Sequence, residues 1–129
     1  MPAGDGLTAA QRLQIDKAIR DAETSSRHEF SVYVGRADAQ YGDARAFAHR
    51  LHGSLVNPSR SVLVMVDPAH RVAEIVTGAE VRRSLTDDEV SLALAEMTSL
   101  FEHGDIVHGI VHGICMLAAH AERPRTLHA

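Results

Sequence analysis

The segment SVLVMV, residues Ser61 to Val66, constrains the fold of this chain more than any other part of the sequence. Five of its six residues are apolar, and three of these are valines. A strand of this composition, without alternation of polar and apolar side chains, is typical of a strand buried on both faces in the centre of an α/β sheet. Helices are therefore expected on both sides of the sheet.

Two further strands are expected to pair with this central strand. Residues 29–35 alternate between apolar and polar side chains, which is the pattern of a strand with one face in the core. Residues 71–77 follow the central strand after a short turn that contains Pro68. Because the turn is short, the second and third strands should form an antiparallel hairpin.

Four helices are expected, and each begins at a residue suited to capping its first turn. Thr8 and Thr86 are followed three residues later by Gln or Glu, which is the capping-box pattern. Asp43 and Asp105 can cap the other two helices. The expected helices run from Thr8 to about Ala22–Thr24, from Asp43 to Leu55, from Thr86 towards His103, and from Asp105 to about Ala121. Ala10, Leu13, Ala18 and Ile19 are expected to form the apolar face of the first helix.

The order of the elements is α, β, α, β, β, α, α. A helix joins the first two strands, so these strands should be parallel with a right-handed crossover. We therefore predict an α/β fold, a three-layer α/β/α sandwich around a small mixed sheet of about three to four strands. Residues 1–121 are expected to form a single domain. Residues 122–129, which contain a proline and few apolar side chains, are expected to be a flexible tail.

Composition argues against several classes of protein. The net charge of the 129 residues is -4 with the nine histidines neutral, so nucleic acid is not an expected partner. No apolar run is long enough to cross a bilayer, and residues 1–11 lack the features of a signal peptide, so we expect a cytoplasmic protein without a membrane span. The single cysteine, Cys115, is expected to be a small buried hydrophobic residue.

Four segments, taken in order, resemble the TPM domain family, which includes thylakoid-lumen proteins linked to photosystem repair and many bacterial proteins. They are Asp5-Gly6-Leu7-Thr8 before the first helix, SVLVMVDPAHRVAEIVTG with Arg71, Leu85-Thr86-Asp87 before the third helix, and Phe101, Gly104-Asp105, Gly109 and Gly113 near the end. The match extends from about Asp5 to Ala119. Two features depart from the family pattern: the sequence VNPSRS stands in place of a glycine-rich segment, and the signal peptide and membrane anchor of many members are not evident. These departures indicate a divergent bacterial branch of the family. The resemblance implies an α/β/α sandwich, calcium binding in some members and weak phosphatase activity in a few.

Four aspartates are expected to meet at one end of the sheet. Ligands of α/β sheets favour the carboxyl ends of parallel strands, and Asp38 and Asp67 follow the first and second strands. The start of the first helix, near Asp5, lies at this end, and the long third helix returns the chain there at Asp105. Carboxylates and loop carbonyls are the ligands that Ca²⁺ prefers, so the sequence predicts a Ca²⁺ site. Each aspartate also fits a local role in a loop, turn or cap that needs no ligand.

Three histidines, His108, His112 and His120, lie along one face of the fourth helix. A pair at positions i and i+4 can bind zinc, but the Glu of an HExxH motif is missing and no third ligand is evident. We therefore favour a solvated or partner-facing stripe over a metal site, and we interpret the pair His49 and His52 in the same way. The opposite stripe, expected in the core, is Ile106, Ile110, Ile114 and Leu117.

Catalytic signatures are missing from the sequence: it contains no nucleophile elbow, P-loop or dinucleotide-binding glycine motif. The favoured function is a non-enzymatic module that binds or assembles with an unknown protein partner and carries a Ca²⁺ site, with no other cofactor. The first alternative is a weak metal-dependent phosphatase that uses the acidic end of the sheet. The second is a His-based metal-binding or pH-responsive protein. The sequence does not assign an oligomeric state.

Overall fold

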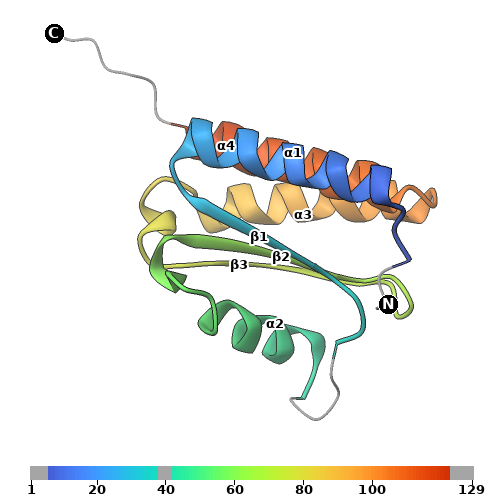
Figure 1. Ribbon diagram of the computed structural model, residues 1–129. Helices are drawn as coiled ribbons and strands as arrows, with labels where there is room; N and C mark the ends of the chain where they lie inside the picture. The colour runs from blue at the N-terminus through green and yellow to red at the C-terminus, as the bar shows by residue number, and fades with distance from the viewer. Residues whose placement is uncertain (1–5, 38–41, 123–129) are drawn as a thin grey trace, which may run out of the picture.

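The computed structural model describes residues 6–37 and 42–122. Its elements are α1 (Ala9–Ser26), β1 (Glu29–Val34), α2 (Ala44–Gly53), the 3-10 helix η2 (Pro58–Arg60), β2 (Ser61–Asp67), β3 (Val72–Thr77), the 3-10 helix η3 (Val81–Arg83), α3 (Asp87–Glu102) and α4 (Ile106–Ala121). The strands form one sheet in the order β1-β2-β3, with β1 parallel and β3 antiparallel to β2. Helix α2 covers one face of this sheet, and α1, α3 and α4 cover the other (Figure 1). The predicted three-layer α/β/α sandwich with a small mixed sheet is confirmed.

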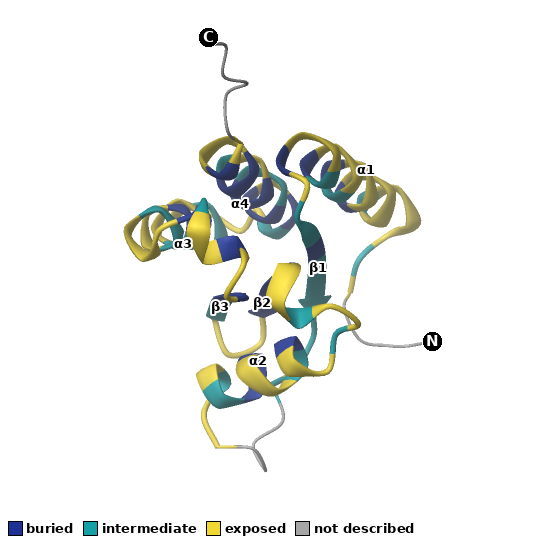
Figure 2. Cartoon of the chain, turned by 90° about the vertical axis from the view of Figure 1, so that its left-hand side faces the viewer, coloured by how far each residue is buried: buried dark blue, intermediate teal, exposed yellow. Residues whose placement is uncertain are grey.

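The central strand β2 is buried along its whole length, as its sequence predicts. Because side chains alternate across a strand, Val62, Val64 and Val66 pack into the core beneath the three-helix layer. Leu63 and Met65 pack into a smaller core beneath α2. Buried positions of the helices face inward and exposed ones face outward (Figure 2). One apolar strand therefore supplies both cores.

The parallel strands β1 and β2 end level with one another. Val34 is the register partner of Val66, and the amide of Gly35 continues the pairing by donating to the Val66 carbonyl at 3.0 Å. Asp67 is the next residue of β2 and pairs with Val72 at the start of β3. The carboxyl end of the parallel pair, where ligands of α/β sheets bind, is thus marked by Asp67.

All four helices begin at the predicted capping residues. Complete capping boxes are present at Thr8 and Thr86. The carboxylate of Asp43 accepts from the Ala46 amide at 2.9 Å, and that of Asp105 accepts from the His108 amide at 3.0 Å. These bonds satisfy amides that have no partner within the helix. Each cap needs residues only three positions away, so it forms from local sequence alone.

Several predicted details differ from the structure, among them the end of α1, which extends to Ser26. The buried face of α1 is formed by Ile15, Ala18, Ala22 and Ser26, whereas Leu13 is 66% exposed and Ala10 is exposed. The position of the neighbouring helix α4, rather than hydrophobicity along α1, selects this face. Helix α2 ends at Gly53 instead of Leu55. Strand β3 begins one residue later than predicted because Arg71 adopts a left-handed conformation with φ 56°.

Helices α3 and α4 pack closely because α4 has two glycines at their contact. A Cβ atom added at Gly109 would lie less than 3.0 Å from the Phe101 ring, and one added at Gly113 equally close to the Met97 side chain. Ile110, Ile114 and Leu117 are fully buried beside them, as predicted, while Ile106 is half-buried. Within the described part of the chain, no helix is both long enough and apolar enough to cross a membrane.

Candidate functional site

Asp67 joins two loops at the carboxyl end of the parallel strands. Its side chain is 2% exposed. One carboxylate oxygen, Oδ1, accepts from the His70 amide at 3.2 Å. The other, Oδ2, accepts from the Ala37 amide at 3.0 Å and pairs with Nδ1 of His70 at 2.8 Å. The carboxylate therefore holds the segment after β1 against the turn between β2 and β3.

These contacts keep Asp67 ionised. Burial raises the pKa of this carboxyl, but the hydrogen bonds from Ala37 and His70 together outweigh burial and place the pKa below the ordinary value of 3.8. A buried carboxylate with three donors is satisfied without a metal ion. Asp67 consequently acts first as a structural link at this end of the sheet.

The lowered pKa of Asp67 predicts a loss of stability in acid. A carboxyl whose pKa is lower in the folded than in the unfolded state contributes stability above its unfolded pKa, and this contribution disappears as pH falls through the folded pKa. We expect the free energy of unfolding to decrease below about pH 4. Urea titrations between pH 6 and pH 3 would measure this, and Asp67→Asn should show a flatter profile. An equal slope in the variant would contradict the assignment.

A pocket of about 340 Å³, here called the rim pocket, adjoins Asp67. Its walls come from the β2–β3 turn, the end of α3 and the turn between α3 and α4, and its lining residues are Val66, Asp67, Pro68, Arg71, Val72, Ala73, Thr98, Phe101, Glu102, Gly104 and Ile106. Most of these side chains are apolar, and two exposed ones, Arg71 and Glu102, carry opposite charges. The positive φ of Arg71 is uncommon outside glycine, and such backbone conformations concentrate at functional sites.

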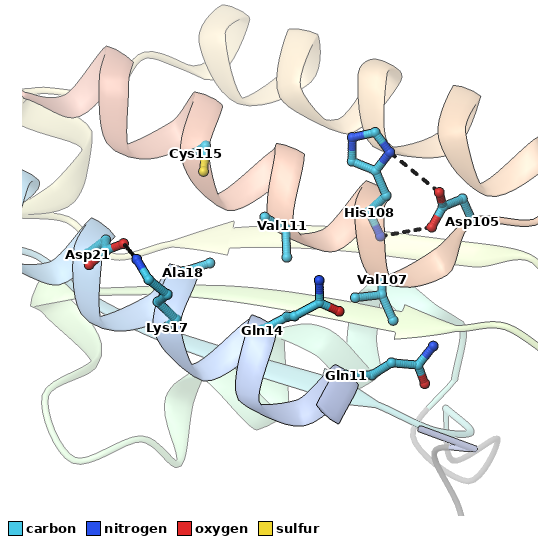
Figure 3. Close-up of a pocket in the computed structure, with 10 residues that line it drawn as sticks. All are labelled: Gln11, Gln14, Lys17, Ala18, Asp21, Asp105, Val107, His108, Val111 and Cys115. Carbon is cyan, nitrogen blue, oxygen red and sulfur yellow. Dashed lines mark hydrogen bonds and ion pairs between the residues drawn. The ribbon is translucent and has the colours of Figure 1, made fainter. Parts of the chain in front are cut away.

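The four aspartates of the predicted Ca²⁺ site have different outcomes. Asp5 and Asp38 lie outside the described residues. Asp67 is buried, as described above. Asp105 is exposed, and its side chain lines a second hollow, between α1 and α4 (Figure 3). Its neighbours Gly104 and Ile106 nevertheless line the rim pocket, so α3 does return the chain to this end of the sheet.

Metal-ligating side chains do not gather into a larger cluster in the described residues. Within residues 6–37 and 42–122, no group of three or more His, Cys, Asp or Glu side chains is placed to hold a metal ion. A Ca²⁺ site at this end of the sheet therefore depends on Asp5 and Asp38, and it stays a prediction.

The hollow between α1 and α4, here called the helix groove, has a volume of about 510 Å³. In Figure 3, Lys17 pairs with Asp21 on α1, with a distance of 2.9 Å between the charged atoms. Cys115 lies on the wall of this groove and is exposed, which corrects the predicted burial of its side chain. It occupies the α4 position after Ile114, on the side turned towards α1 rather than the sheet.

The histidine stripe of α4 is partly exposed, but each member faces a carboxylate. His108 Nδ1 lies 3.4 Å from Asp105 Oδ2. His112 Nε2 lies 3.1 Å from Glu96 Oε1, and His120 Nδ1 lies 3.3 Å from Glu89 Oε2. The latter two carboxylates belong to α3 and were not connected with the stripe by sequence reasoning. The sequence spacing is consistent with this pairing. Glu89 and Glu96 are seven residues apart on α3, and the histidines that they face on the antiparallel α4, His120 and His112, are eight residues apart.

The second histidine pair is not uniformly solvated, contrary to the sequence-based interpretation. His52 is 8% exposed, and its Nε2 atom lies 3.0 Å from the Ser61 carbonyl oxygen. This contact anchors the end of α2 to the start of β2. His49 is exposed, as expected.

The architecture places the chain in the class of small three-layer α/β domains. Three solved structures share this fold. The BA42 protein of Bizionia argentinensis has a TM-score of 0.69 and 23% identity, and the match covers 90% of this chain and 81% of that chain. The N-terminal domain of cg2496 from Corynebacterium glutamicum has a TM-score of 0.72 and 13% identity, with coverages of 96% and 85%, and the N-terminal domain of a P. gingivalis protein has a TM-score of 0.66 and 18% identity, with coverages of 88% and 75%. These identities are low, so the likeness concerns the fold alone.

Within this class, the chain belongs to the DUF5130 family, a domain of unknown function, whose sequence profile matches residues 3–118. The uncharacterized proteins MT2543 and Rv2468c, from two strains of Mycobacterium tuberculosis, are each 28% identical over 110 residues, which is 85% of this chain and 64% of theirs. The chain therefore spans less than two thirds of the length of these relatives. The resemblance to TPM domains stays an interpretation of the order of motifs.

Proposed function

We propose that this protein is a non-enzymatic binding module whose ligand-binding surface is the rim pocket. The observation that carries the proposal is the position of this pocket: it lies at the carboxyl end of the parallel strands and combines an apolar lining with two exposed charges, Arg71 and Glu102. Ligand sites are typically concave, mainly apolar and furnished with a few polar groups, and they favour this end of α/β sheets.

The chemistry of the pocket favours binding over catalysis. The buried carboxylate at its floor, Asp67, already accepts three hydrogen bonds and is thereby held in its ionised form. A general acid or base needs a proton affinity near the working pH and access to the substrate. The lowered pKa and 2% exposure of Asp67 give it neither property.

A divalent cation is proposed as part of the same surface, with Asp5, Asp38, Asp67 and Asp105 as the contributing carboxylates. Two observations support the position. Asp38 follows Ala37, whose amide is held by Asp67, and the turn that contains Asp105 borders the rim pocket through Gly104 and Ile106. Because Asp67 is occupied by its donors, Asp38, Asp105 and Asp5 would supply most of the ligands for Ca²⁺.

Thermal unfolding tests the cation component. We expect millimolar Ca²⁺, added after treatment with EDTA, to raise the melting temperature by several degrees. A ligand present at about 100 times its dissociation constant stabilises the folded state by about 2.7 kcal/mol, which is sufficient for a shift of this size. Differential scanning fluorimetry with Ca²⁺, Mg²⁺ and Zn²⁺ in separate wells measures the effect and its selectivity.

Three variants locate the ion. Asp38→Ala should abolish the Ca²⁺-dependent shift, and Asp105→Ser should weaken it while keeping a residue that can cap α4. Asp16→Ser, at an exposed position of α1, is the matched control and should leave the shift unchanged. A shift that persists in Asp38→Ala and Asp105→Ser would contradict the site.

Hydrolysis of p-nitrophenyl phosphate by the wild type but not by Asp38→Ala would contradict the non-enzymatic function and favour the phosphatase alternative.

A further inference from the structure

We propose that His108 and His112 form a binding site for a divalent transition-metal ion, with Asp105 and Glu96 as its outer-shell carboxylates. The four side chains lie on the exposed side of the α3–α4 hairpin, and none of them lines the rim pocket. Asp105 is the one residue shared with the cation site proposed above, and both metal ligands, His108 and His112, are separate from that site, so the inference does not rest on the proposed function. It would take an ion that favours imidazole, such as Cu²⁺, Ni²⁺ or Zn²⁺, rather than Ca²⁺.

The two imidazole rings are near enough to share one ion after small rotations of their side chains. His108 and His112 are one helical turn apart, and their ring centroids are 6.3 Å apart with an interplanar angle of 81°. A metal about 2.1 Å from a ring nitrogen lies about 3.2 Å from the ring centre, so two rings on one ion have centres at most about 6.4 Å apart. For a tetrahedral ion the separation is about 5.2 Å. Rotations of the exposed rings that bring their centres about 1 Å closer therefore suffice.

The hydrogen-bonding surroundings of the rings provide the second argument. The carboxylate of Asp105 faces Nδ1 of His108 at 3.4 Å, and that of Glu96 faces Nε2 of His112 at 3.1 Å. Each ring is thus approached by a carboxylate at one nitrogen, and among the described residues the other nitrogen has no hydrogen-bond partner. Histidines that ligate metals usually donate their second ring N–H to a carboxylate in this way, which fixes the tautomer and raises the basicity of the ligand.

Both carboxylates are held in position by the fold. Asp105 caps α4 through its Oδ1 atom, which accepts from the His108 amide at 3.0 Å, while its Oδ2 atom faces the His108 ring. Glu96 extends from α3, and the close packing at Gly109 and Gly113 brings it within reach of His112. The site thus couples two helices, although both metal ligands belong to α4.

The charges around the site favour a cation. Asp105 and Glu96 supply two carboxylates next to the rings, and His120, two turns beyond His112, faces a further carboxylate, Glu89. Across the helix groove, the ammonium of Lys17 is paired with Asp21 at 2.9 Å, so its charge is largely balanced. A divalent ion bound to the two rings would face more negative than positive charge.

Two protein ligands leave the remaining coordination positions to water. This agrees with the finding that the described residues contain no group of three or more ligating side chains. Structural zinc sites use four protein ligands, so this site should bind an exchangeable ion with a lower affinity. Among divalent ions, the general order of stability predicts that Cu²⁺ binds more tightly than Ni²⁺ or Zn²⁺.

Isothermal titration calorimetry on the full chain, freed of metal with EDTA, tests the proposal with CuCl₂, NiCl₂ and ZnCl₂. We expect one ion per chain, with the highest affinity for Cu²⁺, and at least a tenfold loss of affinity in both His108→Gln and His112→Gln. His103→Gln is the matched control, because the ring of this exposed histidine lies 2.9 Å from the Ser99 carbonyl oxygen on its own helix, and the variant should bind as the wild type does. Unchanged affinity in both test variants, or an equal loss in the control, would overturn the proposal.

Electron paramagnetic resonance of the Cu²⁺ form separates ligation from folding. We expect hyperfine splitting from two imidazole nitrogens in the wild type and from one in each single variant. Glu96→Gln should keep both nitrogens and lower the affinity by about tenfold, as expected of an outer-shell residue. A wild-type spectrum without two nitrogen ligands would contradict the site. Asp38→Ala should bind Cu²⁺ normally, so failure of the Ca²⁺ proposal and failure of this one are distinguishable.

Discussion

Replacing Asp67 with alanine is expected to lower the free energy of unfolding by about 2–3 kcal/mol, because the variant removes a buried carboxylate that accepts from three partly buried donors. The amides of Ala37 and His70 and the ring of His70 all contact this carboxylate at 3.2 Å or less. They belong to two separate loops, so water would have to enter between the loops or the loops would have to separate. Either change also opens the floor of the rim pocket.

Urea denaturation followed by circular dichroism measures this loss. Asp67→Asn retains the shape and one acceptor oxygen, and it should fall between alanine and the wild type. Asp21→Ala is the matched control: it removes an exposed carboxylate that pairs with Lys17, and such surface pairs contribute little. A stability of Asp67→Ala within 1 kcal/mol of the wild type, or equal losses in Asp67→Ala and Asp21→Ala, would show that the carboxylate does not hold the two loops together.

The features of this fold that could be predicted from sequence are those set by neighbouring residues. The capping boxes at Thr8 and Thr86 need a partner only three positions away, and both are present. The burial of β2 on both faces follows from its composition, and this in turn requires helices on both sides of the sheet. The three-layer architecture was therefore predictable from one strand and the order of the elements.

Features decided by contacts between distant segments were not predictable in the same way. Leu13 is more hydrophobic than Ala22, yet Ala22 is buried and Leu13 is exposed, because the position of α4 determines the buried face of α1. The same applies to His52, which is buried against the Ser61 carbonyl, and to Cys115, which faces the helix groove. In each case the neighbour that determines exposure lies on another element.

The candidate sites show the same division. Topology correctly placed Asp67 at the carboxyl end of the parallel strands, and His70 is a local partner three residues away, but the donor from Ala37 lies 30 residues away and no local pattern indicates it. The spacing of His108 and His112 was evident, whereas Glu96 becomes a neighbour only when α3 and α4 fold against each other. The sequence-based interpretation disfavoured a metal site because no third metal ligand was evident. The fold places a carboxylate beside each of the two rings, Asp105 beside His108 and Glu96 beside His112.

Gly78→Ala is expected to lower the free energy of unfolding by about 3 kcal/mol or more, because the added methyl group collides with backbone atoms. A Cβ atom at this position would lie less than 3.0 Å from the carbonyl oxygens of Pro58 and Ser59. The Gly78 amide donates to the Ser61 carbonyl at 3.0 Å, which holds the end of β3 against the start of β2. A backbone clash cannot be relieved by changing a rotamer, so the two segments would have to separate.

Gly53→Ala is the matched control, since a Cβ atom at this helical residue meets nothing within 4 Å and should raise stability by up to about 1 kcal/mol. Gly113→Ala should cost less than Gly78→Ala, because its added methyl group meets the flexible side chain of Met97 rather than backbone. Thermal and urea unfolding of the three variants would give this order directly. If Gly78→Ala were as stable as the wild type, the close contact between the end of β3 and η2 would be wrong. Because that contact fixes one end of the β2–β3 hairpin and Asp67 fixes the other, a large loss in both variants would show that the hairpin is held at its two ends.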